Sequence, residues 1–251
     1  KRRKPVASAT FFTTLLDFSD PGELKVFIDE SQVRQHEQKL KAGGVMPGKQ
    51  LAQTFAMLRA NDLIWNYVIN NYMKGKTPPP FDILYWNSDS TNMSAHMYTW
   101  YLRNMYLENR LTKPGELELC GVKLDLGKID APTYFLSTVE DHIAPWKTTF
   151  TSTELVKGPI EFVLAASGHV AGVINHPSKN KRNYWYNGEL GQGAEHWLKK
   201  AERAPGSWWP HWSEWLKQQG GKMVDAPKQT GSAEFPELEP APGAYVKGEA
   251  A

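Results

Sequence analysis

Short, continuous apolar runs alternate with longer mixed segments along this chain. The runs APTYFLS at 131–137 and IEFVLAA at 160–166 are rich in β-forming residues, and they predict strands that are buried on both faces. The run VASATFFTTLLDF at 6–18 predicts another buried strand, which ends at the turn-forming segment SDPGE. The segments between these runs are long enough to hold helices. The pattern therefore predicts an α/β fold with a mostly parallel sheet that helices cover on both faces.

The stretch from 20 to 114 carries a different, helical pattern. Apolar residues at helical spacing predict helices at 49–58, 62–75 and 94–111. The last of these has Ser94 as its cap and carries an aromatic stripe with Tyr98 and Trp100, for which core packing is the default interpretation. Beyond it, GELELCGVKLDLGKI at 115–129 alternates in the manner of a short hairpin.

Tryptophan gathers near the end of the chain, where the segment 195–221 holds five of the ten tryptophans. Trp208, Trp212 and Trp215 fall on one helical face. The basic face of this segment is too thin for a typical membrane-surface helix, so we expect the tryptophans to pack on the domain. The tail that follows is rich in Pro, Gly and Glu, which is typical of an extended segment.

Charge and cysteine content narrow the function classes. The chain has 251 residues and a net charge of +2, from 29 basic and 27 acidic side chains, so no strong attraction to nucleic acid is expected. No apolar stretch approaches the roughly 20 residues that span a bilayer. The single cysteine, Cys120, excludes intrachain disulfides and suits a reducing cytoplasm. Its place in the predicted hairpin favours a buried, inert thiol.

Titratable residues follow two of the predicted strands. Asp141 comes after the run at 131–137, and His169 comes after the run at 160–166. Carboxyl ends of neighbouring parallel strands meet at one edge of a sheet, where a carboxylate can orient a histidine that acts as a base. Structural alternatives remain open, because Asp141 also suits a helix cap, His169 a buried structural histidine, and the adjacent His142 a loop position. The histidine spacings match no metal-binding motif.

The chain lacks the nucleophile that such a pair would serve. Neither G-x-S-x-G nor G-x-C-x-G occurs in the sequence. Cys120 has no elbow glycines around it, and Ser167 is too close to His169 in sequence to serve as an elbow serine.

Several segments together resemble the C-terminal part of the catalytic domain of class I polyhydroxyalkanoate synthases, in the order that this family has them. They include TFFTTLLDFSDPGEL, RANDLIWNYVINNYMKG, PFDILYWNSDSTNM, APTYFLSTVEDHIAPW, ASGHVAGVINHPSKNKR and GSWWPHW. The resemblance runs from about residue 5 to about residue 247. These enzymes polymerise (R)-3-hydroxyacyl-CoA thioesters into a storage polyester.

The resemblance implies an α/β-hydrolase fold, here the C-terminal portion of a mostly parallel sheet, with an inserted and largely helical cap. The implied domains are a core strand at 1–19, the cap at 20–114, the core with the acid and the histidine at 115–225, and an extended tail at 226–251. The catalytic Asp of the family falls on Asp141, either as the residue that orients the histidine or as a helper in activating the 3-hydroxyl, and the catalytic His falls on His169. The nucleophilic Cys of the family falls before Lys1, so we expect this chain alone to be inactive.

The implied activity is acyl transfer with release of CoA. The CoA thioester is a substrate, and no cofactor is implied. Tyr85, Trp86 and Trp100 are candidates for lining a substrate tunnel, and His142 is a candidate modulator. The implied partners are the acyl-CoA, the growing polyester and a second copy bound through the cap, with no nucleic acid and no membrane span, at the surface of cytoplasmic granules. An esterase or depolymerase, and a non-catalytic product that binds granules or an intact synthase, are the alternatives.

Overall fold

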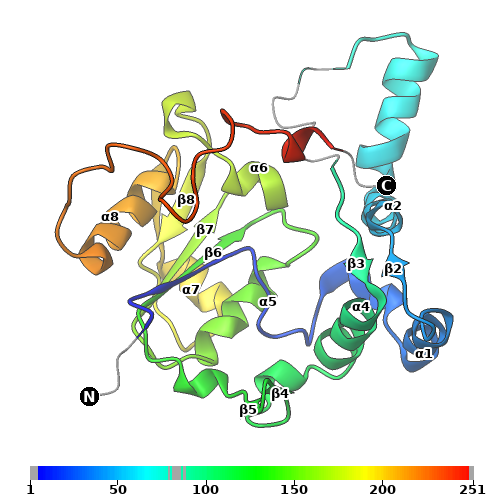
Figure 1. The fold of residues 1–251 in the computed structure, drawn as a ribbon, viewed down its shortest axis with the longest axis horizontal. Coiled ribbons are helices and arrows are strands. Elements are labelled where there is room, and N and C mark those ends of the chain that lie inside the picture. The colour runs from blue at the N-terminus through cyan, green and yellow to red at the C-terminus, as the bar shows by residue number, and fades with distance from the viewer. Residues whose placement is uncertain (1–4, 79, 81–85, 87–88, 249–251) are drawn as a thin grey trace. The chain divides into compact units, whose positions relative to one another are not determined.

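The computed structural model describes residues 5–78, 80, 86 and 89–248 and divides into two compact units (Figure 1). The first unit comprises Lys1–Ala42 and His96–Gly220. The second comprises Gly43–Ala95 and Gly221–Ala251. The first unit contains both residues of the predicted pair, Asp141 and His169.

A five-stranded sheet forms the centre of the first unit, in the order β1-β6-β7-β8-β9. Its strands are β1 (Ala9–Phe12), β6 (Thr133–Thr138), β7 (Ile160–Ala165), β8 (Asn183–Tyr186) and β9 (Glu202–Pro205). The strands β1, β6 and β7 pair in parallel, whereas β8 and β9 are antiparallel to their neighbours. The prediction of an α/β fold is confirmed, but the sheet is mixed rather than mostly parallel. The half-buried segment NYWY of β8 lies among polar residues and gives no continuous apolar run.

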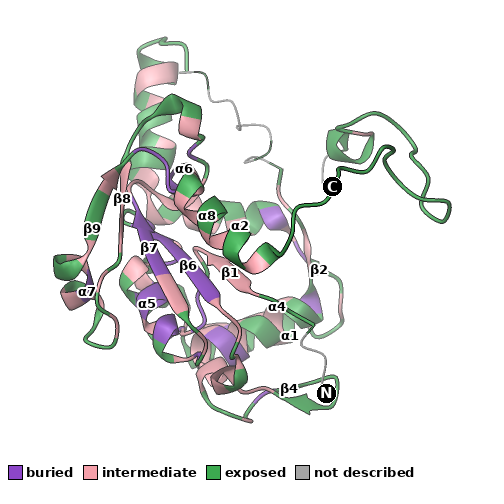
Figure 2. Cartoon of the chain, turned by 90° about the vertical axis from the view of Figure 1, so that its left-hand side faces the viewer, coloured by how far each residue is buried: buried purple, intermediate pink, exposed green. Residues whose placement is uncertain are grey.

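β6 is buried along its whole length and β7 over its last four residues, which explains their continuous apolar sequence (Figure 2). Tyr134 and Leu136 pack on one face, and Phe135 packs on the other, because successive side chains of a strand point to opposite sides. The Phe135 face is covered by α5 (Trp146–Thr151) and α7 (Ala194–Lys200). The Tyr134 face is covered by α6 (His169–Val173) and α8 (Trp209–Gly220).

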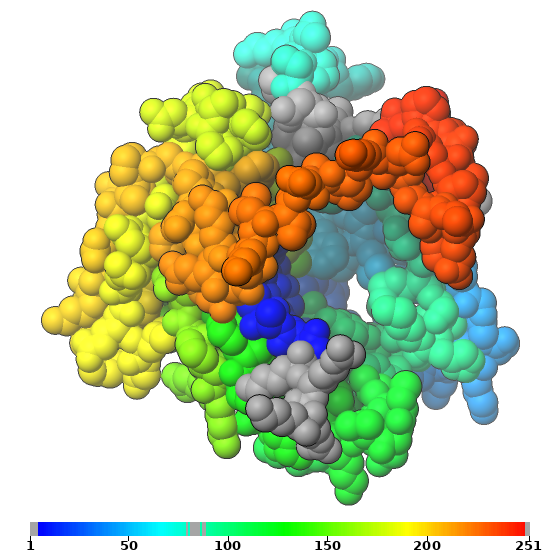
Figure 3. All heavy atoms as spheres, turned by 60° about the vertical axis from the view of Figure 1, so that its left-hand side comes forward, coloured from blue at the N-terminus to red at the C-terminus, as the bar shows by residue number. Residues whose placement is uncertain are grey.

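The tryptophan face predicted near the end of the chain packs on this second face of the sheet. Trp208 is 2% exposed, and its ring meets that of Phe12 edge to face at 5.1 Å. Trp215 packs against Tyr134, and the Trp212 indole donates a 3.2 Å hydrogen bond to Thr10 Oγ1. Figure 3 shows the face of the molecule on which α8 and the start of β1 meet. Packing on the domain is thus confirmed for this segment.

Several helical segments flank the sheet within the first unit. These are a 3-10 helix at Gly22–Phe27, α1 (Glu30–Lys39), α4 (Ala95–Tyr101) with its π-helical continuation Leu102–Leu107, and 3-10 turns at Arg110–Thr112, Leu126–Lys128, Ser152–Glu154 and Pro177–Lys179. The guanidinium of Arg103 joins α1 to the π-helical segment, because it forms ion pairs with Glu30, Glu37 and Glu108. The helix predicted over 94–111 ends earlier than expected, at Leu107. Asn109, two residues further on, has a left-handed backbone.

A two-residue turn at Cys120 and Gly121 joins β4 (Glu118–Leu119) to β5 (Val122–Lys123). Both turn residues have positive φ, 51° at Cys120 and 74° at Gly121, as in the tight turns that match the twist of a hairpin. The hairpin prediction is confirmed. The expectation of a buried thiol is wrong, since a hairpin tip projects into solvent and Cys120 is exposed.

The second unit contains β2 (Val45–Met46), which pairs antiparallel with β3 (Met93–Ser94). It also contains α2 (Gly48–Leu58), followed by π-helical segments at Asn61–Trp65 and Val68–Met73. These agree with the helices predicted at 49–58 and 62–75. In the tail, the described residues from Gly221 to Gly248 are almost all exposed, with a 3-10 turn at Tyr245–Lys247. Within the described part of the chain, no helix combines the length and the apolar character that crossing a membrane requires.

Candidate functional site

The loops that follow β6 and β7 are bonded to each other at one edge of the sheet. The amide of Val139 donates to the carbonyl of Ala165 at 2.9 Å, and the amide of Glu140 donates to the carbonyl of Ser167 at 3.0 Å. These bonds continue the parallel pairing of the two strands past their ends. They bring Asp141 and His169 together where the sequence pattern predicts a shared edge.

The Asp141 carboxylate is the centre of this arrangement. Its side chain has no exposed area, and its Oδ2 lies 2.8 Å from Nδ1 of His169. Its Oδ1 accepts hydrogen bonds of 2.8 Å from the backbone amides of both Ile143 and Ala144. The Thr138 hydroxyl donates a longer bond of 3.4 Å to Oδ2. Because every buried polar atom needs a partner, these donors fix the carboxylate in one orientation.

Asp141 contacts both the turn that follows it and the histidine, but it does not cap a helix. One oxygen caps the turn over residues 141–144, and the other oxygen holds the histidine. The turn is not a helix start, since α5 begins only at Trp146. The bonds to the turn orient the second oxygen toward His169.

His169 is the first residue of α6, and its side chain is 29% exposed. A carboxylate can only accept hydrogen bonds, so the proton of a neutral His169 ring resides on Nδ1. The other ring nitrogen, Nε2, then carries a lone pair that can accept a proton. Ser167, two residues earlier, has a left-handed φ of 83°, which is uncommon for a non-glycine residue and marks a strained turn before the histidine.

Gly172 sets the distance between α6 and β6. A Cβ atom at this position would come within 2.5 Å of Thr138 Cγ2, so only glycine allows the helix to approach the strand this closely. Sequence reasoning missed this residue and the amides of Ile143 and Ala144. The sequence carries one signal for Gly172, which is its place as the fourth residue of a short helical segment. Glycine is disfavoured inside a helix unless close packing requires it.

The remaining predicted site residues lie in several parts of the chain. His142 is half-buried beside Asp141. Trp100 belongs to the first unit and is 37% exposed, whereas Trp86 belongs to the second unit and is 64% exposed. Tyr85 lies outside the described residues. The tunnel and the modulator role therefore stay predictions.

The single cysteine of the sequence is not placed to serve His169. Cys120 lies at the tip of the β4–β5 hairpin, which precedes the amino end of β6, and α6 follows the carboxyl end of the adjacent strand β7. The two elements lie toward opposite ends of the sheet (Figures 1 and 2). The described residues thus bring together a histidine and a carboxylate at the ends of β6 and β7.

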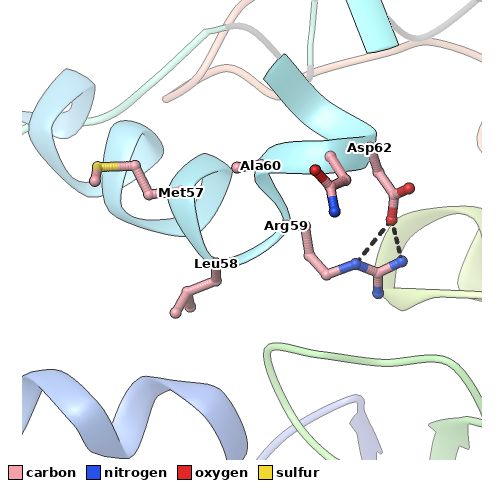
Figure 4. Close-up of a pocket in the computed structure, with 6 residues that line it drawn as sticks. Met57, Leu58, Arg59, Ala60 and Asp62 are labelled. Carbon is pink, nitrogen blue, oxygen red and sulfur yellow. Dashed lines mark hydrogen bonds and ion pairs between the residues drawn. The ribbon is translucent and has the colours of Figure 1, made fainter. Parts of the chain in front are cut away.

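Two pockets are lined by residues other than Asp141 and His169. One, of about 350 Å³, is lined by six successive residues, Met57 to Asp62, where α2 gives way to the π-helical segment (Figure 4). The Arg59 guanidinium there forms an ion pair with Asp62. The other, of about 310 Å³, lies between β7, the segment after β8, and Trp197 of α7. Within the described ranges, no three His, Cys, Asp or Glu side chains gather so as to hold a metal ion.

Comparison with known proteins finds close similarity over almost the whole chain. It is 51% identical to the poly(3-hydroxyalkanoate) polymerase subunit PhaC of Cupriavidus necator, in an alignment of 251 positions that covers 98% of this chain. It is 48% identical over 242 residues to the subunit of the same name in Rhizobium meliloti, and 42% identical over 241 residues to poly(3-hydroxyalkanoate) polymerase 2 of Ectopseudomonas oleovorans. Each of the latter two alignments covers 96% of this chain. No protein-family model matches the chain.

The chain spans about two fifths of the length of these curated relatives, with coverage of 43%, 39% and 43% respectively. The resemblance that the sequence motifs indicate is thus confirmed: the chain is similar to one part of a polyhydroxyalkanoate synthase.

Proposed function

We propose that this chain is the C-terminal part of the catalytic domain of an acyltransferase that polymerises (R)-3-hydroxyacyl-CoA and releases CoA. The observation that carries the proposal is the 2.8 Å contact between Asp141 Oδ2 and His169 Nδ1 at the ends of adjacent parallel strands. The names of the similar proteins, which are poly(3-hydroxyalkanoate) polymerases, support the substrate class. In this proposal His169 is the general base and Asp141 orients it.

The proposed first step is formation of an acyl-enzyme. Nε2 of His169 accepts the proton of a cysteine thiol, and the thiolate attacks the carbonyl carbon of the acyl-CoA thioester. The tetrahedral intermediate collapses when the C–S bond to CoA breaks, and the imidazolium returns the proton to the departing sulfur. The resemblance places this cysteine before Lys1. Asp141 stabilises the imidazolium that forms during the step, since its carboxylate already bonds Nδ1.

The proposed second step is elongation. The 3-hydroxyl of one hydroxyacyl unit loses its proton to a base and attacks the thioester carbonyl of another unit, so that an ester bond forms and a thiolate leaves. His169 is the base that the geometry favours, because its Nε2 carries the free lone pair and its side chain is partly exposed. His142 adjoins Asp141 and is proposed to modulate this proton transfer.

The proposed role of the helical segment 20–114 is that of a cap. A cap that excludes water would favour transfer of the acyl group to a hydroxyl over hydrolysis. Tyr85, Trp86 and Trp100 are proposed to line the path of the substrate beneath it. Association of two copies through this segment, and location at the granule surface, are further parts of the proposal.

The product of the reaction tests this function directly. The full-length gene product is incubated with (R)-3-hydroxybutyryl-CoA, and CoA, free 3-hydroxybutyrate and polyester are measured together. We expect CoA release to be matched by polyester. Free acid in equal amount to CoA would instead identify a thioester hydrolase, and absence of CoA release would identify a non-catalytic binding protein.

A further inference from the structure

The helix that begins with His169 is too short to fix its own position. α6 contains 5 residues, His169–Val173. An isolated helix of this length is unstable in water, since few hydrogen bonds offset the entropy of ordering the backbone. The orientation of the His169 side chain therefore depends on what holds the two ends of α6.

The amino end of α6 is held by the bond from His169 to Asp141, and Gly172, near the other end of the helix, packs closely against Thr138 of β6. The carboxyl end presents backbone carbonyls that have no partner within a helix. Here those carbonyls accept bonds from side chains distant in sequence. Trp208 Nε1 donates to the carbonyl of Gly172 at 3.1 Å, and Trp209 Nε1 donates to the carbonyl of Val173 at 2.9 Å.

A third donor completes the set. The Arg182 guanidinium donates to the carbonyl of Ala171, so three successive carbonyls of α6 are bonded to side chains. The Trp208 donor is the best shielded from water, because Trp208 is 2% exposed and its bond is buried, whereas the Trp209 bond is partly buried. Arg182 reaches from an exposed position, where water competes for its bonds.

The tryptophan pair is itself anchored to the sheet. The Ser207 hydroxyl accepts a 3.1 Å bond from the amide of Trp209 and so fixes the start of α8. The Trp208 ring contacts Phe12 of β1 at 5.1 Å and Trp212 of α8 at 6.0 Å between ring centres. The contacts that reach α6 thus run from Phe12 of β1 through Trp208 and on to His169, whereas the indole N–H group of Trp212 bonds Thr10 of β1.

We propose that Trp208 and Trp209 are positioning residues for His169, because their indole N–H groups fix α6 so that the imidazole meets Asp141. Neither ring needs to touch the substrate for this role. The effect on catalysis rests on the proposed acyl transfer. The effect on the hydrogen bond between Asp141 and His169 does not, which allows the two to be tested separately.

The test compares three substitutions in the full-length gene product. Trp208→Phe and Trp209→Phe each remove an indole donor to α6 and retain an aromatic ring. Trp212→Phe is the matched control, since it removes an indole bond of similar length, but that bond goes from α8 to Thr10 of β1. Replacement of Trp208 by 3-benzothienylalanine removes the N–H group alone and preserves the shape, which covers the case in which Trp208→Phe fails to fold.

Two readouts are expected to change together. For Trp208→Phe and Trp209→Phe we expect kcat for CoA release to fall about tenfold with KM little changed, because a small displacement of a base affects the chemical step. We also expect the downfield NMR signal of the His169 Nδ1 proton to broaden or move upfield in ¹⁵N-histidine-labelled protein. This signal is assigned by its disappearance from the spectrum of His169→Asn. Trp212→Phe should leave both readouts near the wild-type values.

Each outcome decides one of the two proposals. If the Trp208 and Trp209 variants keep the wild-type rate and signal, or if Trp212→Phe alters them equally, the positioning role is overturned. If the wild type releases no CoA but the proton signal still responds only to Trp208 and Trp209, the positioning role stands and the proposed acyl transfer fails.

Discussion

The carboxylate of Asp141 and the imidazole of His169 form a 2.8 Å hydrogen bond although 28 residues separate them in the sequence. The parallel pairing of β6 with β7 makes this contact possible, because it places the two following loops side by side. The second carboxylate oxygen is occupied by the amides of Ile143 and Ala144. The histidine is therefore held by an acid that the local turn already orients.

Replacing this acid by its amide should reduce activity without unfolding the protein. In Asp141→Asn the side-chain oxygen can still accept bonds from the turn, but the amide nitrogen then faces Nδ1 of His169 and disfavours the tautomer with a free Nε2. We expect CoA release from (R)-3-hydroxybutyryl-CoA to fall by about 10²- to 10⁴-fold, the range typical of a lost orienting carboxylate. Thermal unfolding of the variant should stay within a few degrees of the wild type. A wild-type rate would mean that Asp141 only caps the turn.

The close approach of α6 to β6 predicts a pair of compensating substitutions. Gly172→Ala places a methyl group within 2.5 Å of Thr138 Cγ2, and we expect it to lower the unfolding free energy by about 1–3 kcal/mol and to reduce the rate of CoA release. Thr138→Ser removes that methyl group and keeps the hydroxyl that bonds Asp141. The double variant should recover part of both losses in urea unfolding and in the rate assay. Purely additive effects would show that this contact does not set the helix position.

The exposed hairpin turn predicts a stabilising change at the single cysteine. Cys120 has a φ of 51°, a conformation that asparagine adopts more readily than other non-glycine residues. We expect Cys120→Asn to raise the unfolding free energy by about 0.5–1 kcal/mol, and Cys120→Val to lower it, in matched urea titrations. CoA release by Cys120→Asn should equal that of the wild type. A large loss of activity would give the thiol a role that its position does not suggest.

His211 of α8, which lies on the Tyr134 face of the sheet, predicts a dependence of stability on pH. Burial lowers the pKa of His211. Its Nδ1 lies 3.0 Å from the Tyr134 hydroxyl, and its Nε2 lies 3.9 Å from the Glu161 carboxylate. The rings of Tyr184 and Tyr186 also lie beside it. Between the ordinary value of 6.5 and this lowered pKa, the unfolded chain binds more protons than the folded one. The folded state therefore loses stability as the pH falls through that window. Burial also raises the pKa of Glu161 above its ordinary value of 4.5. This shift has the opposite effect on stability, because the folded chain binds more protons than the unfolded one between 4.5 and the raised pKa.

The check is the free energy of unfolding measured at pH 7.5 and pH 5.5. We expect the decrease toward acid to be smaller in His211→Asn than in the wild type. The exposed His96 offers a matched control, and His96→Asn should retain the full decrease. Equal pH dependence in the wild type and His211→Asn would show that this group does not control it.

Continuous apolar runs and helical spacing were sufficient to predict much of the first unit. The runs at 131–137 and 160–166 correspond to β6 and β7, and the pair Asp141–His169 follows from their adjacency. The spacing of Trp208, Trp212 and Trp215 likewise predicts the face that packs on the sheet. In each case a strong local pattern and the tertiary structure agree.

Features that depend on short or half-buried segments were not predictable in this way. β8 is half-buried along its length, and β9 is largely exposed, so neither gives the apolar run that marks a central strand. The predicted strand at 6–18 is shortened to Ala9–Phe12 because Thr13 has a φ of 45°. The bonds from Trp208 and Trp209 to α6 join segments 36 residues apart, and no local pattern contains them.

The rate of CoA release by a His169→Asn variant of the full-length gene product tests the central claim most directly. The chain supplies a chemically matched control, since His196 also contacts a carboxylate, Glu189, at 3.1 Å on an exposed surface away from the sheet edge. We predict that His169→Asn lowers CoA release from (R)-3-hydroxybutyryl-CoA by at least about 10³-fold, whereas His196→Asn retains the wild-type rate. Comparable rates for the wild type and His169→Asn would contradict the assignment of His169 as the catalytic base.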